Sequence, residues 1–152
     1  MVVFLTQEEA TELLELLKKC VSSSISLPKQ GEREDISVVS TERESEKFII
    51  SVNRRNKRVN KVSYVARYKR GDVVLLRLDI GVTSPHVNPE ALGGERLTGP
   101  HLHIYQEGFE EKYAIPFDIE DDDLITNFLE FLKKFNVLAP TKIVELLPLT
   151  EG

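Results

Sequence analysis

The stretch VNKVSYVARYKRGDVVLLRLDI, residues 59–80, predicts two antiparallel strands joined by a tight turn. Residues 59–68 alternate between apolar and polar side chains, which is typical of a strand with one buried face. Gly71 and Asp72 favour a turn, and the alternation resumes in residues 73–80. The second strand is expected to bury Val74, Leu76, Leu78 and Ile80 and to present Val73, Leu75, Arg77 and Asp79 on its other face.

Further strands and two helices are expected on either side of this pair. The strand-like runs are residues 36–39, 47–52, 101–105 and 112–117. Thr6 and Glu9 fit a capping box that begins a helix expected to continue to Val21, and acidic residues 121–123 cap a second amphipathic helix. We therefore expect a single α+β domain over residues 1–152, with an antiparallel sheet of about five or six strands and an N-terminal and a C-terminal helix.

The composition is that of an ordinary globular domain, with 152 residues, 41% of them hydrophobic and 30% charged. The lone cysteine, Cys20, excludes a disulfide framework and a cysteine-based zinc cluster. The apolar runs are too short to cross a bilayer. We therefore expect a cytoplasmic protein with no membrane partner.

Basic residues gather in one part of a chain whose formal net charge is −5. Residues 53–70 hold eight basic side chains and no acidic one, namely Arg54, Arg55, Lys57, Arg58, Lys61, Arg67, Lys69 and Arg70. Such a stretch suits the phosphate backbone of RNA, because lysine and arginine release its counterions on binding. The same stretch is also consistent with a solvated hairpin, or with one that docks against the acidic residues 107–123.

All three histidines lie within residues 86–103. His101 and His103 are two apart in a predicted strand, so their rings share a face. Arg77 and Asp79 share a face of another predicted strand for the same reason. If the two strands are neighbours, the resulting polar patch consists of Arg77, Asp79, His101 and His103, with Tyr105 as an optional member and His86 from the long loop as a cover.

Metal-free RNA cleavage is the first chemistry that suits this set. His101 and His103 would act as general acid and base, because the ordinary pKa of imidazole lies near working pH. Arg77 would hold the phosphate through its guanidinium group. Asp79 would orient a histidine or Arg77, and His86 would close over the substrate. This hypothesis needs no cofactor.

Two other interpretations of the same residues stay open. Two histidines at i and i+2 on a strand can bind one metal ion, with Asp79 or His86 as a third ligand. Alternatively, the histidines are structural hydrogen-bonding residues around the long loop of residues 81–100, and the chain is a non-enzymatic interaction protein of a phage or mobile element.

One ordered series of motifs resembles known families. The series is Arg77-Leu78-Asp79, Pro85-His86-x-Asn88-Pro89, Gly99-Pro100-His101-Leu102-His103-Ile104-Tyr105 and Glu107-Gly108-Phe109. It resembles a family of small uncharacterised bacterial and phage-associated proteins. More distantly it is similar to the TumE-type toxins of toxin–antitoxin pairs, although Leu78 and Ile80 replace their tyrosine and asparagine. That similarity implies a toxin-like RNA-binding or RNA-cleaving protein of a mobile-element or defence locus, with RNA and a small antitoxin-like protein as partners.

Overall fold

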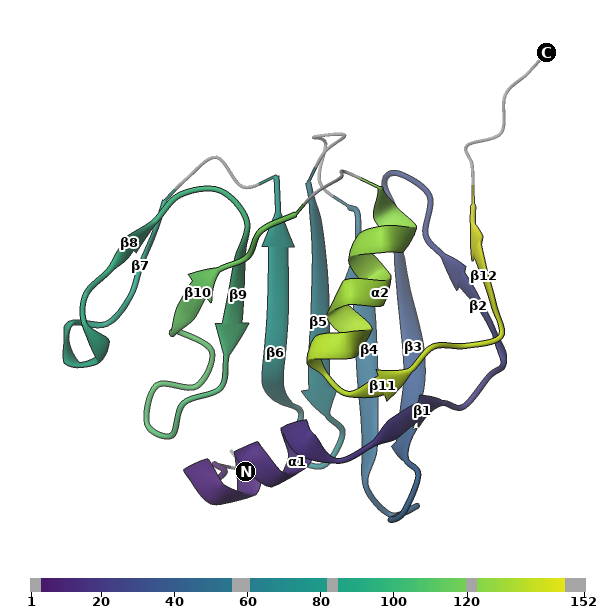
Figure 1. The fold of residues 1–152 in the computed structure, drawn as a ribbon, viewed down its shortest axis with the longest axis horizontal. Helices are drawn as coiled ribbons and strands as arrows, with labels where there is room; N and C mark the ends of the chain where they lie inside the picture. The colour runs from purple at the N-terminus through teal and green to yellow at the C-terminus, as the bar shows by residue number, and fades with distance from the viewer. Residues whose placement is uncertain (1–3, 56–60, 82–84, 120–122, 147–152) are drawn as a thin grey trace.

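An eight-stranded sheet is the centre of the fold in the computed structural model, which describes residues 4–55, 61–81, 85–119 and 123–146 (Figure 1). In spatial order the strands are β10 (Ala114–Pro116), β9 (His101–Ile104), β6 (Val73–Ile80), β5 (Val62–Tyr68), β4 (Lys47–Asn53), β3 (Arg33–Ser40), β1 (Lys18–Cys20) and β11 (Val137–Leu138). Neighbouring strands are antiparallel except β1 and β11, which are parallel. The α+β prediction is confirmed. The sheet is larger than predicted and mixed, because strands of only two or three residues extend its edges.

Two helices and two small sheets complete the described part of the chain. α1 (Gln7–Glu15) begins at the predicted capping box, in which Thr6 and Glu9 bond each other's backbone. α2 (Leu124–Lys134) begins where the Asp123 carboxylate accepts from the amide of Thr126. The small sheets pair β2 (Ser24–Leu27) with β12 (Lys142–Glu145), and β7 (His86–Val87) with β8 (Arg96–Leu97), with the 3-10 turn η1 (Glu90–Leu92) between β7 and β8. Among the described residues, no helix has the length and apolar character needed to cross a membrane.

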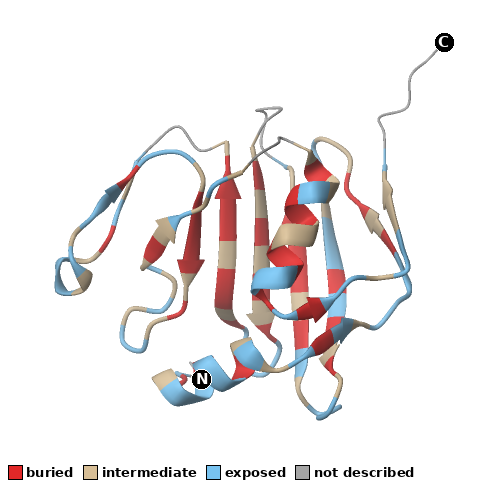
Figure 2. Ribbon diagram, viewed as in Figure 1, coloured by how far each residue is buried: buried red, intermediate tan, exposed pale blue. Residues whose placement is uncertain are grey.

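α2 lies across one face of the sheet, over its most deeply buried strands (Figures 1 and 2). The ring of Tyr64 stacks on Phe131 with centroids 5.8 Å apart, and Phe48 meets Phe135 edge-on at 5.4 Å. The hydroxyl of Tyr64 donates to the carbonyl of Leu124 at 3.0 Å, so this buried polar group has a partner. Each large apolar side chain buried in this layer contributes about 1.5–3 kcal/mol, which holds α2 on the sheet.

The strand register brings the candidate polar residues onto the opposite face of the sheet. Asp79 on β6 lies directly opposite His101 on β9, and Arg77 lies opposite His103. On the other side of β6, the partner of Asp79 is Ser63 of β5. The two strands are thus neighbours, as the polar patch requires, and their polar side chains point away from α2.

A β-bulge near the start of β6 changes which side chains point to each face of the sheet. The pair Ala66–Leu76 is followed by the pair Arg67–Val74, so Leu75 is an extra residue on β6. Val74 therefore lies on the face of Arg67. The prediction that Val74 shares a face with Leu76 is wrong, because the extra residue shifts the alternation by one position.

The first helix is shorter than predicted. α1 ends at Glu15, and the next residues form β1 in place of the predicted last turn. Lys18 is fully buried, and its Nζ donates to the carbonyl of Leu14 in the last turn of α1 and to that of Leu16 just after the helix. The same Nζ donates to the carbonyl of Phe135 at the end of α2 and lies 4.0 Å from the centroid of that ring. The cation that a helix C-terminus prefers is thus supplied by the following strand.

Candidate metal centre

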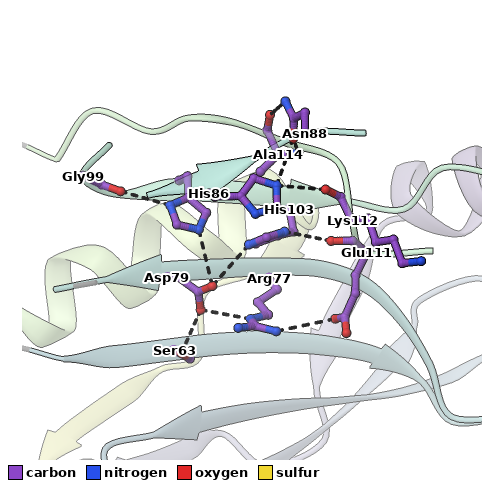
Figure 3. A network of polar contacts seen from close by, with 11 residues as sticks. Ser63, Arg77, Asp79, His86, Asn88, Gly99, His103, Glu111, Lys112 and Ala114 are labelled. Atoms are coloured by element: carbon purple, nitrogen blue, oxygen red, sulfur yellow. Dashed lines mark hydrogen bonds and ion pairs between the residues drawn. The ribbon is translucent and has the colours of Figure 1, made fainter. Parts of the chain in front are cut away.

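Three imidazole rings meet above the uncovered face of the sheet (Figure 3). His101 and His103 come from β9, and His86 comes from β7. The ring centroids of His101 and His103 lie 4.8 Å apart, and His86 lies 5.4 Å from His101 and 4.8 Å from His103. One ring nitrogen from each histidine lies within 4.8 Å of the other two. The loop residue that was predicted to cover the patch therefore takes part in it.

Asn88 holds His86 over the sheet. Its Nδ2 donates to the carbonyl of Ala114 on β10, and its Oδ1 accepts from the amide of Ala114, both at 2.8 Å. The same Oδ1 lies 3.0 Å from Nε2 of His86. Asn88 is buried and ties the hairpin of β7 and β8 to the edge of the main sheet. The sequence interpretation gave it no role, although it stands in the quoted Pro-His-x-Asn-Pro motif.

Each histidine has one ring nitrogen against a backbone carbonyl. Nδ1 of His101 lies 3.0 Å from the oxygen of Gly99, and Nδ1 of His103 lies 2.7 Å from that of Glu111. Nε2 of His86 lies 2.9 Å from the oxygen of Lys112. Since a carbonyl oxygen only accepts, these three nitrogens carry the protons. In the neutral rings, the lone pairs are then on Nε2 of His101, Nε2 of His103 and Nδ1 of His86.

Asp79 places a buried carboxylate beside two of these lone pairs. Its Oδ1 accepts from the hydroxyl of Ser63 at 2.8 Å and from Nε of Arg77 at 3.0 Å. Its Oδ2 lies 3.2 Å from Nε2 of His103 and 3.6 Å from Nε2 of His101. An oxygen anion facing two lone pairs is repelled by both of them. A cation, either a proton or a metal ion, is needed between these groups.

The electrostatics of the site favour an anionic Asp79 and a neutral His101. Burial raises the pKa of Asp79, but the groups around it outweigh burial and hold that pKa well below its usual range. They are the hydrogen bonds from Arg77 and Ser63, the Arg77 charge and, when Nε2 of His103 carries a proton in place of its lone pair, a hydrogen bond from His103. Burial lowers the pKa of His101, so its ring tends to be neutral. A neutral imidazole and an ionised carboxylate are the forms that ligate metal ions.

Arg77 lies between the cluster and solvent. Its guanidinium contacts Asp79 at 3.0 Å and Glu111 at 3.9 Å, and its side chain is 37% exposed. The side chains of His101 and His103 are only 4% and 8% exposed. Solvent therefore reaches the arginine but hardly reaches the two rings that were predicted to exchange protons with a substrate.

The five predicted catalytic residues thus converge in one place: Arg77, Asp79, His86, His101 and His103. Tyr105 has a different setting. Its hydroxyl donates to the carbonyl of Leu5 at 2.8 Å and accepts from the amide of Leu5 at 3.0 Å. The optional place of Tyr105 in the patch is therefore wrong, because β9 ends at Ile104 and the ring packs against the N-terminal segment.

The predicted nucleic-acid-binding residues are divided between the two ends of β4 and β5. Arg54, Arg55 and Lys61 lie at one end, and Lys69 and Arg70 lie at the other, with Arg67 on β5 itself. Arg54 donates to the carbonyl of Pro28, and Arg67 donates to the hydroxyl of Ser51. Lys57 and Arg58 lie outside the described residues. The described members therefore do not form one continuous patch.

The chain matches one family model, which covers residues 5–137 and so includes the whole cluster. The chain belongs to this family. It is described as "Family of unknown function (DUF6978)". No curated protein and no solved structure matches the chain significantly. Of the elements described above, β12 lies wholly beyond the part that matches DUF6978, and β11 ends one residue past it.

Proposed function

We propose that this DUF6978 chain binds a divalent transition-metal ion, with zinc as the best fit, through Asp79, His86, His101 and His103. The distances from Asp79 Oδ2 to the two Nε2 atoms carry the proposal, at 3.2 and 3.6 Å. Zinc bonds of about 2.0–2.1 Å at tetrahedral angles put neighbouring ligand atoms about 3.3 Å apart. The distances from Asp79 Oδ2 to Nε2 of His101 and to Nε2 of His103 therefore match two edges of a zinc tetrahedron.

The outer contacts of the rings support the same proposal. Histidines that bind metals generally donate their second ring N–H to a carboxylate or a backbone carbonyl, which fixes the tautomer and the ring plane. His101, His103 and His86 each have such a carbonyl contact. A donor set of imidazole and carboxylate without thiolate suits zinc, iron or nickel. A bound ion would join β6, β7 and β9 and so hold the hairpin of β7 and β8 on the sheet.

Metal analysis tests this proposal directly. The full chain, purified without a histidine tag, is expected to retain about one zinc ion per molecule after gel filtration. Asp79→Asn removes a ligand charge at nearly constant shape and is expected to lower zinc affinity by at least about tenfold, since the loss of even an outer contact typically costs that much. Asp35→Asn is the matched control, because Asp35 also bonds a serine and an arginine on this sheet. A folded wild-type chain that takes up no zinc would overturn the proposal.

RNA cleavage is the second candidate function. It is supported by Arg77 beside the histidines and by the similarity of the motif order to TumE-type toxins. Burial of His101 and His103 favours the metal site, since an acid and a base must come within hydrogen-bond reach of their substrate. Incubation of a structured RNA in EDTA with the wild type and with the His101→Ala/His103→Ala variant tests cleavage. Equal, negligible cleavage by the two proteins would exclude metal-free catalysis.

A further inference from the structure

Three lysines line up across the face of the sheet that α2 leaves uncovered. Lys19 on β1 pairs with Val39 on β3, and Val39 pairs with Lys47 on β4. The amide of Lys69, just after β5, donates to the carbonyl of Lys47. Paired residues in a sheet point to the same face, so the three ammonium groups lie in one row. With strands about 4.8 Å apart, the row is about 14 Å long.

This row borders a groove of about 570 Å³, lined also by Val39, Ile49 and Ser37. All three lysines are exposed, and none of them has an ion pair within the residues that the structure describes. The acidic residue that lines the groove is Glu44. The net charge of the chain is −5, so this groove is a local concentration of positive charge on an acidic protein.

We propose that this lysine groove binds single-stranded RNA through its phosphates. A single strand carries one phosphate per nucleotide, so a strand that follows the row can bring phosphates to the ammonium groups. A groove of this volume suits one strand, and the apolar side chains of Val39 and Ile49 offer a surface for bases or sugars. The hydroxyl of Ser37 can bond a ribose 2′-hydroxyl, which favours RNA over DNA. This inference does not depend on the metal site.

Fluorescence anisotropy with a labelled RNA of about ten nucleotides tests the groove. Three phosphate contacts to a single strand predict that the affinity falls about 20-fold for a fourfold rise in salt. The variant Lys19→Gln/Lys47→Gln/Lys69→Gln is expected to bind at least about tenfold more weakly than the wild type at low salt. The matched control is Lys133→Gln/Lys134→Gln/Lys142→Gln, which removes the same charge from α2 and β12 and is expected to bind as the wild type does.

Thermal melts of both variants establish that they remain folded. The proposal is overturned if the wild type does not bind the RNA at low salt, or if the two triple variants lose affinity equally. Poly-glutamate at the same charge concentration and a DNA strand of the same sequence are expected to bind more weakly than the RNA. Equal binding of poly-glutamate would show a general anion site, and equal binding of the DNA would overturn the choice of RNA.

Discussion

Removing the side chain of Asn88 is expected to lower both the free energy of unfolding and the affinity of the chain for its metal ion. Asn88→Ala deletes both bonds to Ala114, which itself has no solvent exposure. The amide and the carbonyl of Ala114 then lose their side-chain partner. Each buried group left unpaired costs about 1–3 kcal/mol, so for these two groups we expect the free energy of unfolding to fall by about 2–6 kcal/mol. Urea denaturation followed by far-UV circular dichroism measures this change.

The same variant should also release His86, because Oδ1 of Asn88 lies 3.0 Å from its Nε2. Loss of such an outer contact typically lowers metal affinity by about 10- to 100-fold, which competition with a chromogenic chelator measures. Asn53→Ala is the control, since the Asn53 side chain accepts from the exposed amide of Arg55. If Asn88→Ala lowers the free energy of unfolding by less than about 0.5 kcal/mol, the bonds to Ala114 do not stabilise the fold as argued, because a loss this small is usual for a surface substitution.

Three further predictions follow from the buried polar groups. Zinc at about 100 times its dissociation constant should raise the free energy of unfolding by about 2.7 kcal/mol. In Asp79→Asn, whose zinc affinity is at least about tenfold lower, calorimetry at that concentration should show a gain of at most about 1.4 kcal/mol. Lys18→Met should destabilise the chain by about 2–4 kcal/mol in urea titrations, because the carbonyls of Leu14, Leu16 and Phe135 lose their donor. Burial lowers the pKa of Lys18 to about 7, whereas the unfolded chain keeps this proton up to about pH 10.4. Between these pH values the folded state binds fewer protons than the unfolded state. The free energy of unfolding of the wild type, relative to that of Lys18→Met, should therefore rise by up to about 1.4 kcal/mol per pH unit. A difference that does not change with pH would contradict the lowered pKa.

Local periodicity was sufficient to predict the strands that carry the site. The alternation over residues 73–80 placed Arg77 and Asp79 on one face, and the spacing of His101 and His103 did the same for β9. Which strands become neighbours depends on the packing of the whole chain, so the meeting of β6 with β9 could be stated only as a condition. The position of His86 depends on bonds from Asn88 to a strand 26 residues away, which no local pattern encodes.

The errors in the sequence interpretation also concern features that local sequence patterns do not encode. The helical spacing of leucines continues past Glu15, but the chain pairs there with β3 and β11, which are distant in the sequence, and so forms the short strand β1. Residues 73–76 are all apolar, so nothing in the sequence indicates the bulge at Leu75. Lys19 and Lys47 lie outside the basic run of residues 53–70, so sequence proximity could not group them with Lys69.

Lys18 also couples segments that are more than a hundred residues apart. Its ammonium bridges the last turns of both helices, its amide donates to Asn136, and its strand runs beside β11. The side chain of Asn136 in turn donates to the carbonyl of Glu15. The C-terminal ends of α1 and α2 are therefore fastened to each other through Lys18 and Asn136. In native-state hydrogen exchange, the amides of α1 and α2 should become exposed in a single opening event, with one shared dependence on denaturant.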